Sequence, residues 1–576
     1  MKMDIVDNFT VSDWEQNKDR CVQLLSQDDF INKIPELNKE NAKHYENKLV
    51  RFRGMVQDTL NPEYYFEKCQ VFNSKTGTYT IRSGKYRDFI ACEEDEELMV
   101  NAAENTHQEK HVIHCVKIPG LNSWTRQFKY TDDQDSVNIR NEKRKLLDAE
   151  NEEAMEIDSS DTNKKQVTET IALNSGTSST EDSSMKCDNS CATDVNVDPL
   201  PESPVELFNG CESCLLNLYD VKDTDIKVND VIDVIGFLST ENTEQMEEST
   251  SLSTLPKIHV VRANFGVSTF SNMLQYHKEH VLQTAQQLRD ELWIMFTDVL
   301  AGDTLAADYL ICHLISSVYS RQDLLALGKF SLNLSNVPFH LCESKYVNEL
   351  YKLLSHLLEK SCFMPISIQY LNNTTMVPKK DYDQNRLKGG DLQLSSNTHL
   401  IIDETRLEPG QLMDKGVRNV QALGNVITNQ KLEYDFEFYS CPFYTDIPVL
   451  TFSEGKSLLP SDCRLVMEPD ASCIENINEA FARTWKKMSD PLLSKLRVYL
   501  NNISSLKYDL SASMQQVIQE DFVKMRRENS KINADDLHNL LVLSRLLSVS
   551  RGMQTLEKNI WDYACRLEQQ RKDRLR

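Results

Sequence analysis

The feature that most limits how this sequence can fold is an acidic stretch near its middle that lacks aromatic residues. Residues 151–200 contain no Phe, Tyr or Trp, 14 Ser plus Thr, 11 Asp plus Glu and only 3 Lys. Such a stretch buries too little apolar surface to offset the entropy lost on ordering, and we expect a disordered acidic insert over about 133–207. A basic run at 140–145 (RNEKRK) precedes it, which is typical of a nuclear-import signal or of a solvated charged turn.

Alternation of apolar and polar residues on both sides of the insert predicts short strands. The segments are 48–58, 111–117, 213–219, 227–238 and 258–262. Gly54 and Gly236 lie inside the first and fourth, where a missing side chain relieves crowding at a bend. We expect a small closed β-barrel over 47–265, split by the insert, with an all-β sandwich as the alternative. Residues 1–46 are expected to form an N-terminal helical segment.

From about residue 270 the pattern changes to alternating helices and strands, which predicts an α/β layer with a mainly parallel sheet over 270–475. Helices are expected at 281–300, 305–319, 346–358 and 417–428, and strands at 330–334, 364–371, 398–402 and 449–452. Asp303 and Thr304 are good residues to start the second helix. Residues 476–576 are expected to be helical throughout, so the fold class is multidomain α+β and α/β.

Asp403 and Glu404 are the sharpest candidate site residues. They end the apolar segment 398–402 in the manner of a Walker B strand, in which Asp holds Mg²⁺ and Glu polarises water. A buried strand with acids at its exposed end is the simpler explanation. Nucleotide hydrolysis also needs a glycine-rich loop to cradle phosphates, yet no glycine lies between Gly328 and Gly389. We therefore expect no catalytic residues and no cofactor, with Asp403 and Glu404 as a vestigial Walker B pair.

The charge balance argues against strong autonomous DNA binding. With 64 Lys plus Arg and 88 Asp plus Glu, the net charge of −24 repels a phosphate backbone. The sequence predicts no membrane span and no signal peptide, and its 15 scattered cysteines suit a reducing, intracellular compartment. Free thiols are therefore favoured over a zinc site, and no metal is expected. The zinc candidates have the spacing C-x3-C-x19-C-x2-C: Cys187, Cys191, Cys211 and Cys214. His313 and His538 show no ligand partner at a fixed spacing.

Several longer strings closely resemble the MCM-binding protein family, named for the minichromosome maintenance (MCM) complex. They lie at 49–65, 84–88, 227–238, 302–335, 380–405, 452–463 and 533–550. The resemblance covers nearly the whole chain outside the acidic insert and the extreme termini. It implies a non-enzymatic nuclear regulator of DNA replication that binds MCM helicase subunits and reaches chromatin through the MCM complex. It also implies roles in protecting or assembling these subunits, in unloading the complex from replicated chromatin, and in cell-cycle progress and sister chromatid cohesion.

The same resemblance implies that the chain is a degenerate relative of the helicase subunits. The barrel would be an OB fold, 270–475 an AAA+-like domain without a P-loop, and 476–576 a helical lid. The hairpin at 431–439 would lead to the sensor-1 strand at 449–452. Where helicase lids carry an arginine that touches the γ-phosphate, this sequence has Asp535 or Asp536, and 461–463 (Ser-Asp-Cys) stands near the expected arginine finger. Acids at the lid position would repel phosphate.

The sequence is also compatible with two other functions. In the first, Arg51 and Arg53 with Tyr64, Tyr65 and Phe66 form a charge and stacking platform for single-stranded nucleic acid. Alternation of arginine with apolar residues also fits the solvated face of a barrel strand. In the second, Asp403 and Glu404 support a residual ATPase.

Overall fold

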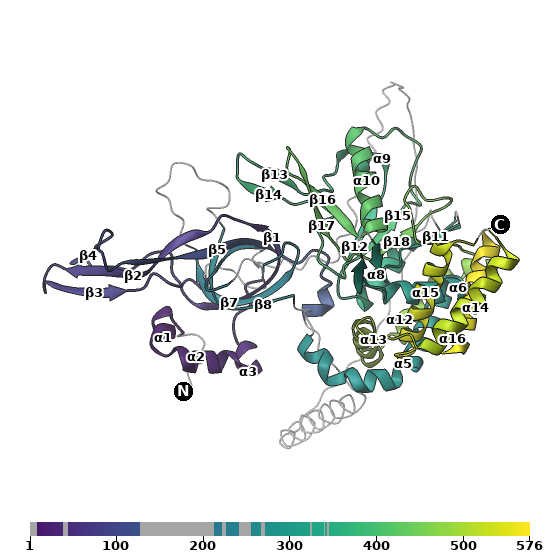
Figure 1. The fold of residues 1–576 in the computed structure, drawn as a ribbon, viewed down its shortest axis with the longest axis horizontal. Coiled ribbons are helices and arrows are strands. Elements are labelled where there is room, and N and C mark those ends of the chain that lie inside the picture. The colour runs from purple at the N-terminus through teal and green to yellow at the C-terminus, as the bar shows by residue number, and fades with distance from the viewer. Residues whose placement is uncertain are drawn as a thin grey trace, which may run out of the picture. The chain divides into compact units, whose positions relative to one another are not determined.

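The computed structural model describes residues 9–38, 44–126, 212–221, 226–240, 255–266, 271–322, 325–338, 340–341, 345–530 and 532–575, with the backbone alone at 28–29 and 271–281. The predicted acidic insert over 133–207 lies outside the described residues, as do the basic run at 140–145 and Cys187, Cys191 and Cys211. The described chain is mixed α and β, with several sheets and a helical C-terminal part (Figure 1).

Three short helices form the N-terminal segment: α1 (Val11–Gln16), α2 (Lys18–Leu25) and α3 (Asp28–Ile31). Thr10 starts α1 with a capping box, in which the Asp13 N–H donates to Thr10 Oγ1 (3.3 Å) and the Thr10 N–H to Asp13 Oδ2 (3.0 Å). Trp14 belongs to a buried cluster that also contains Phe237 of the barrel, so these helices cover part of the barrel's outer surface.

All five predicted strands on either side of the insert are present, and they close into a ring. The eight strands of this part are β1 (Leu49–Thr59), β2 (Glu63–Asn73), β3 (Thr78–Arg82), β4 (Glu96–Leu98), β5 (Thr106–Val116), β6 (Ser213–Leu218), β7 (Val231–Ser239) and β8 (Lys257–Phe265). Strand order is β1-β7-β8-β6-β5, and β5 pairs back with β1. Strands β2, β3 and β4, which sequence patterns did not predict, extend this sheet beyond β5 (Figure 1).

The two barrel glycines lie where the backbone of another strand comes close. A Cβ on Gly54 would stand 2.7 Å from the Val116 carbonyl oxygen, and one on Gly236 would stand 2.3 Å from the His259 carbonyl oxygen. Only glycine allows this approach, which confirms the crowding inferred at both positions. Phe52, 0% exposed, lies at the centre of the apolar interior of the ring.

The α/β part contains a five-stranded sheet in the order β12-β15-β18-β11-β19, and every pair in it is parallel. Its strands are β12 (Ser361–Pro365), β15 (His399–Asp403), β18 (Val449–Phe452), β11 (Leu332–Ser335) and β19 (Cys463–Val466). The mainly parallel sheet is thus confirmed. Sequence patterns missed β19 and placed only the last two residues of β12, Met364 and Pro365.

Helices cover both faces of this sheet (Figure 1). Ile401 and Leu450 face a large core shared with α5 (Ser271–Val299), α6 (Thr304–Leu314), α8 (Tyr346–Leu357) and the C-terminal helices. Leu400 and Val449, one residue away on the same strands, face a second core shared with α9 (Ile368–Asn373) and α10 (Asp414–Asn429). Because neighbouring residues of a strand point to opposite faces, both faces of the sheet are buried.

Two boundaries differ from the prediction. The strand expected at 364–371 ends at Pro365, and α9 begins instead because the Ser367 hydroxyl accepts from the Tyr370 N–H (3.1 Å). The helix expected at 305–319 ends at Leu314. The chain then forms the hairpin of β9 (Ser320–Gln322) and β10 (Leu325–Leu327). A separate sheet joins β14 (Arg386–Lys388), β13 (Lys379–Asp381), β16 (Lys431–Asp435) and β17 (Ser440–Tyr444) in that order.

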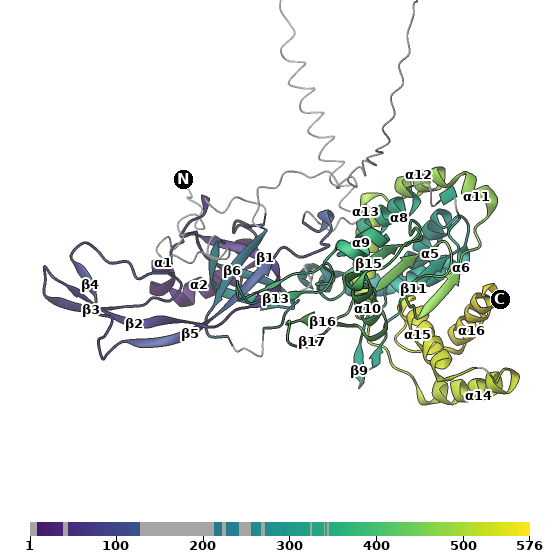
Figure 2. The ribbon, with the colours of Figure 1, turned by 90° about the horizontal axis from the view of Figure 1, so that it is seen from above.

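Beyond β19 the described chain is helical, as predicted. The helices are α11 (Ala471–Glu475), α12 (Ile477–Lys487), α13 (Asp490–Ile503), α14 (Ala512–Glu528), α15 (Ala534–Ser550) and α16 (Lys558–Arg574). Helices α12 and α13 pack on α5, and α15 packs on both α6 and α16 (Figure 2). Their apolar faces continue the core of the α/β part. Among the described helices, none combines the length and the apolar character needed to cross a membrane.

Candidate functional site: the carboxyl edge of the five-stranded sheet

Asp403 and Glu404 lie at the carboxyl end of β15, as the sequence predicts. Asp403 is 3% exposed, and its Oδ1 accepts from the N–H (3.0 Å) and the hydroxyl (2.7 Å) of Thr405. Glu404 is 6% exposed and its Oε2 accepts from the Leu458 N–H (3.3 Å). Burial raises the pKa of Glu404, although hydrogen bonds from the segment that follows β18, including one from Ser457, oppose the shift. Both acids therefore hold loops together.

The backbone after β11, where a phosphate cradle would begin, is already hydrogen-bonded. The Asn336 N–H donates to the Glu454 carbonyl (3.1 Å) and the Val337 N–H to the Ser453 carbonyl (3.2 Å). Pro338 follows and has no N–H to offer. A phosphate cradle needs several free N–H groups that converge on one point, and these groups are not free.

A lysine precedes a helix that follows β11. Lys345 is exposed and stands directly before α8. Without glycine in the preceding segment and without free N–H groups at Asn336 and Val337, a lysine beside a helix start does not form a Walker A loop.

The residues expected near an arginine finger lie at the opposite, amino edge of the sheet. Asp462 accepts from the N–H (2.9 Å) and the hydroxyl (2.8 Å) of Ser331, and it pairs with Lys329. Cys463 begins β19, and burial raises the pKa of its thiol. The acid therefore fixes the start of β11 and β19, and no arginine occupies 461–463.

The two lid acids lie at the start of α15. Asp536 completes a capping box with Asn533, whose side chain accepts from the Asp536 N–H (2.8 Å), and it pairs with Lys572 (3.0 Å). Burial would raise the pKa of Asp536, but the Asn533 N–H and the Lys572 ammonium hold it below its ordinary value. Asp535 is exposed. Asp536 therefore caps a helix and pairs with Lys572, and neither acid offers a positive charge to a phosphate.

The other titratable candidates form no metal site. Cys214 is fully buried in β6, and the described residues contain no group of three or more His, Cys, Asp or Glu that could hold a metal. His313 Nδ1 lies 2.8 Å from the Phe330 carbonyl oxygen, and its ring stands 5.8 Å from that of His399. Burial lowers the pKa of His313 to about 4, so both of these neighbouring rings stay neutral in the core.

The five residues of the proposed nucleic-acid platform do not come together. Arg51 and Arg53 both pair with Asp233 of β7, at 2.8 and 3.3 Å. On β2, Tyr64 is 71% exposed, whereas Tyr65 is 8% exposed and donates to Gln108 Oε1 (3.0 Å). Phe66 packs against the ring of His107. Asp233 therefore offsets the positive charge of Arg51 and Arg53 that would otherwise attract a phosphate backbone.

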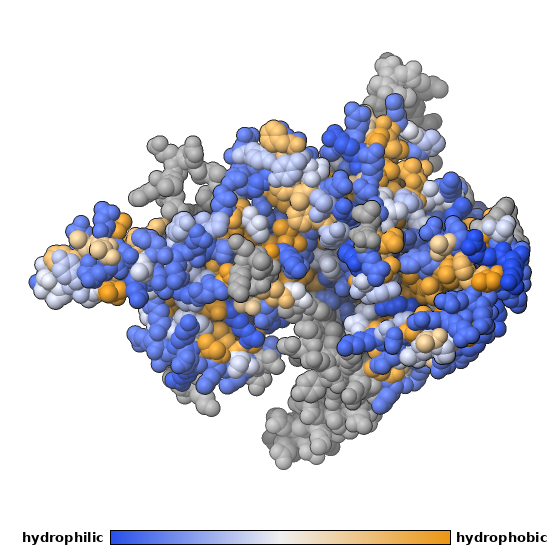
Figure 3. Space-filling view, viewed as in Figure 1, coloured by the Kyte–Doolittle hydropathy of each residue, from blue (hydrophilic) through white to orange (hydrophobic). Residues whose placement is uncertain are grey.

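Sequence patterns did not single out two other surfaces. The tips of the β13–β14 and β16–β17 hairpins carry exposed aromatic rings, with Phe438 83% and Tyr439 59% exposed, in a region where Figure 3 shows apolar atoms on the surface. A cavity of about 970 Å³ lies beside α15, and His538 is the only one of its lining residues that the sequence drew attention to. The sequence alone gives little indication that aromatic residues in a hairpin are exposed. It gives no indication of a cavity whose walls come from segments far apart in the chain.

Comparison with known proteins identifies relatives of the whole chain. A family described as "Mini-chromosome maintenance replisome factor" matches residues 21–575. Curated proteins called mini-chromosome maintenance complex-binding protein align over nearly their whole length. The Drosophila melanogaster protein is 35% identical (96% of this chain, 94% of that protein), the Gallus gallus protein 34% (99% and 95%) and the Homo sapiens protein 33% (98% and 94%).

These relatives are named as binding proteins and not as enzymes. The match extends across the barrel, the parallel sheet and the C-terminal helices, so it concerns the whole architecture and not one module. The chain belongs to the mini-chromosome maintenance complex-binding protein family.

Proposed function

We propose that this chain is a non-enzymatic regulator of DNA replication that binds subunits of the MCM helicase. The printed names of relatives that align over nearly their full length support the partner. The observation that carries the non-enzymatic part is the backbone after β11. Its first two N–H groups donate to the carbonyls of Glu454 and Ser453, and the chain has no glycine between Gly328 and Gly389.

The architecture supports mimicry of a helicase subunit. In this proposal, the closed ring of β1, β7, β8, β6 and β5 is an OB fold. The parallel sheet is a degenerate AAA+ core, and the C-terminal helices are its lid. In its support, β11 and β15 both pair with β18, so the strand before the missing P-loop, the sensor-1 strand and the Walker B strand are neighbours. The β16–β17 hairpin leads into β18 as expected for such a core.

A subunit-like shape without a phosphate cradle explains how the chain would act. It would present an interface of the kind that helicase subunits use to bind one another. A subunit interface formed with this chain could not hydrolyse ATP normally. Such a partner suits the protection or assembly of newly made subunits and the unloading of the complex from replicated chromatin. Roles in mitosis and sister chromatid cohesion, a nuclear location, and chromatin association through the MCM complex belong to the same proposal.

Size-exclusion chromatography of the purified chain with single MCM subunits tests the partner directly. Co-elution with at least one subunit at micromolar concentration, with ATP absent, is the expected result. Failure to co-elute with every subunit would reject the proposal. An ATPase assay of the chain alone, with and without a bound subunit, tests the non-enzymatic part.

A further inference from the structure

The cavity beside α15 lies on the amino side of the sheet, away from Asp403 and Glu404. Its walls come from the segment around the β9–β10 hairpin, from the loop after α13 and from α15. The Val318 N–H donates to Asp446 (3.1 Å), which stands just before β18, and this places the hairpin near the amino ends of the strands. With a volume of about 970 Å³, the cavity can hold a ligand much larger than a single ion.

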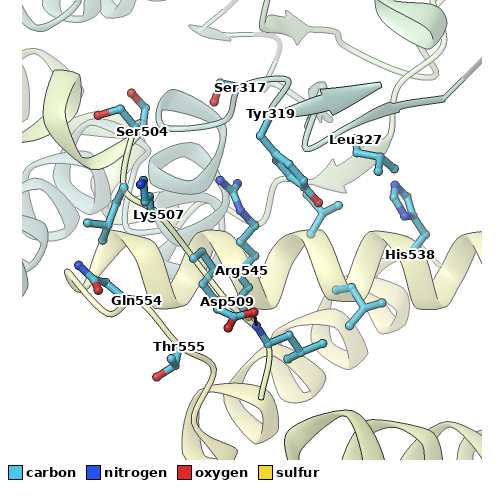
Figure 4. A pocket seen from close by; sticks show the side chains of 16 residues that line it. Ser317, Tyr319, Leu327, Ser504, Lys507, Asp509, His538, Arg545, Gln554 and Thr555 are labelled. Atoms are coloured by element: carbon cyan, nitrogen blue, oxygen red, sulfur yellow. Dashed lines mark hydrogen bonds between the residues drawn. The ribbon is translucent and has the colours of Figure 1, made fainter. Parts of the chain in front are cut away.

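Arg545 is the unusual side chain in this cavity. It is 9% exposed, and its guanidinium carbon stands 4.4 Å from the centre of the Tyr319 ring and 5.9 Å from that of Tyr508. Within the described part of the chain, Arg545 forms no ion pair and no hydrogen bond, and these two rings are its charge-sensitive neighbours. Figure 4 shows the guanidinium beside Tyr319 and facing into the cavity.

Another buried arginine of the same core shows what Arg545 lacks. Arg289 is 4% exposed and pairs with Asp308. Burial would lower the pKa of Arg289, but the Asp308 carboxylate raises it above its ordinary value. Burial also lowers the pKa of Arg545, and there only the hydroxyls of Tyr319 and Tyr508 oppose the shift. Buried guanidinium groups are normally paired with an anion. The planar guanidinium of arginine can donate two parallel hydrogen bonds to a carboxylate.

The remaining lining residues supply polar and apolar contacts for such an anion. Lys507 adds a second cation and is exposed. The carboxylate of Asp509 accepts from the Leu510 N–H (2.8 Å), and in Figure 4 it is directed away from the Arg545 guanidinium. Leu541 and other aliphatic side chains form an apolar wall, which a simple inorganic anion would leave without contacts.

We propose that this cavity binds an acidic peptide segment, with one carboxylate held by Arg545 between Tyr319 and Tyr508 and a neighbouring apolar side chain against Leu541. Lys507 stabilises the carboxylate from the cavity mouth. The site stands on these contacts alone and does not depend on whether the chain binds MCM subunits.

Fluorescence polarisation with two labelled peptides tests the proposal on the full-length chain. One is an acetylated, amidated pentapeptide with a glutamate between two leucines, and the other has glutamine in place of the glutamate. We expect the acidic peptide to bind at least ten-fold more tightly than its control. Equal binding, or no binding of either peptide up to 5 mM, would overturn the proposal, as would displacement of the peptide by an equal concentration of inorganic phosphate.

Two variants and a matched control locate the site. Arg545→Met should reduce the affinity for the acidic peptide at least ten-fold without lowering Tm, since it replaces an unpaired buried cation by an apolar group. Lys507→Ala, on the surface, should reduce it about three-fold. Arg526→Met removes an arginine that packs on Phe522 (5.8 Å) outside the cavity and should leave binding unchanged. Full peptide affinity in folded Arg545→Met protein would mean that this arginine has only a packing role.

Discussion

A buried contact between the start of α6 and the end of α16 should hold the C-terminal helices in place. The Asp303 side chain is 0% exposed and accepts from the N–H groups of Ala306 (3.0 Å) and Glu468 (2.9 Å). It also receives two hydrogen bonds from Arg574, at 2.7 and 3.1 Å. Asp303 therefore joins α6, the segment after β19 and the last turn of α16 in one charged cluster.

The structure sets the size of the effect expected from Arg574→Met. Removing one partner of a buried ion pair typically costs about 3–5 kcal/mol, because the other charge is left uncompensated. Here Asp303 keeps two backbone donors and the Arg574 side chain is 16% exposed, so we expect a smaller cost, about 2–3 kcal/mol. Asp303→Asn keeps the helix cap, and Arg574 can still pair with Glu468, so its cost should be about 1–2 kcal/mol.

Urea unfolding followed by tryptophan fluorescence measures these losses, and Trp561, which is fully buried in α16, contributes a signal from this part of the chain. The double variant of Asp303→Asn with Arg574→Met should lose at least about 1 kcal/mol less than the sum of the single losses. Lys572→Met is the control, because its pair with Asp536 is one-third exposed and should contribute less than about 1 kcal/mol. Additive losses, or an Arg574→Met cost equal to that of the control, would refute the reasoning.

Three further predictions concern the vestigial acid, the buried histidine and the barrel glycine. Because burial raises the pKa of Glu404, the Glu404→Gln variant should have a Tm equal to or higher than that of the unchanged chain. ATP turnover should be at background in both proteins. A measurable turnover of the unchanged chain that is lost in Glu404→Gln would contradict the non-enzymatic account. The pKa of His313 is about 4 in the folded chain and lies near 6.5 when unfolded, so the unfolded chain binds more protons and stability falls as pH drops from 6.5 to 4. This residue should contribute up to about 2 kcal/mol of loss between pH 7 and 5, and urea titrations of His313→Gln should show a flatter pH dependence. Gly236→Ala should lower the Tm of the barrel because its Cβ would stand 2.3 Å from the His259 carbonyl oxygen, and an unchanged melting curve would count against the closed ring.

Most of the regular structure was predictable because local patterns determine it. Strand β18 (Val449–Phe452) lies where the strand-favouring residues Val, Leu, Thr and Phe predict it, and Asp303 caps α6 as its side chain favours. The exceptions have physical reasons. Strands β2 to β4 mix buried and exposed positions, and β3 exposes Tyr79 (58%) and Ile81 (60%), so burial does not follow hydropathy there. Helix α9 begins within a predicted strand because Ser367 caps it.

The candidate site was predictable only in part. The placement of Asp403 and Glu404 at a strand end followed from the apolar run before them, and the absence of glycine already excluded a phosphate cradle. What the sequence could not provide is the pairing of distant residues. Neither the partnership of Arg51 with Asp233 nor the isolation of Arg545 between two tyrosines leaves a signal in local patterns, since each depends on segments far apart in the chain.

Mass photometry of the purified chain mixed with MCM subunits, with and without ATP, tests the central claim most directly. The account predicts a complex of defined mass that forms without ATP, because the described backbone after β11 offers no phosphate cradle for a nucleotide to fill. A chain that stays alone under every condition, or one that joins a complex only when ATP is present, would contradict it.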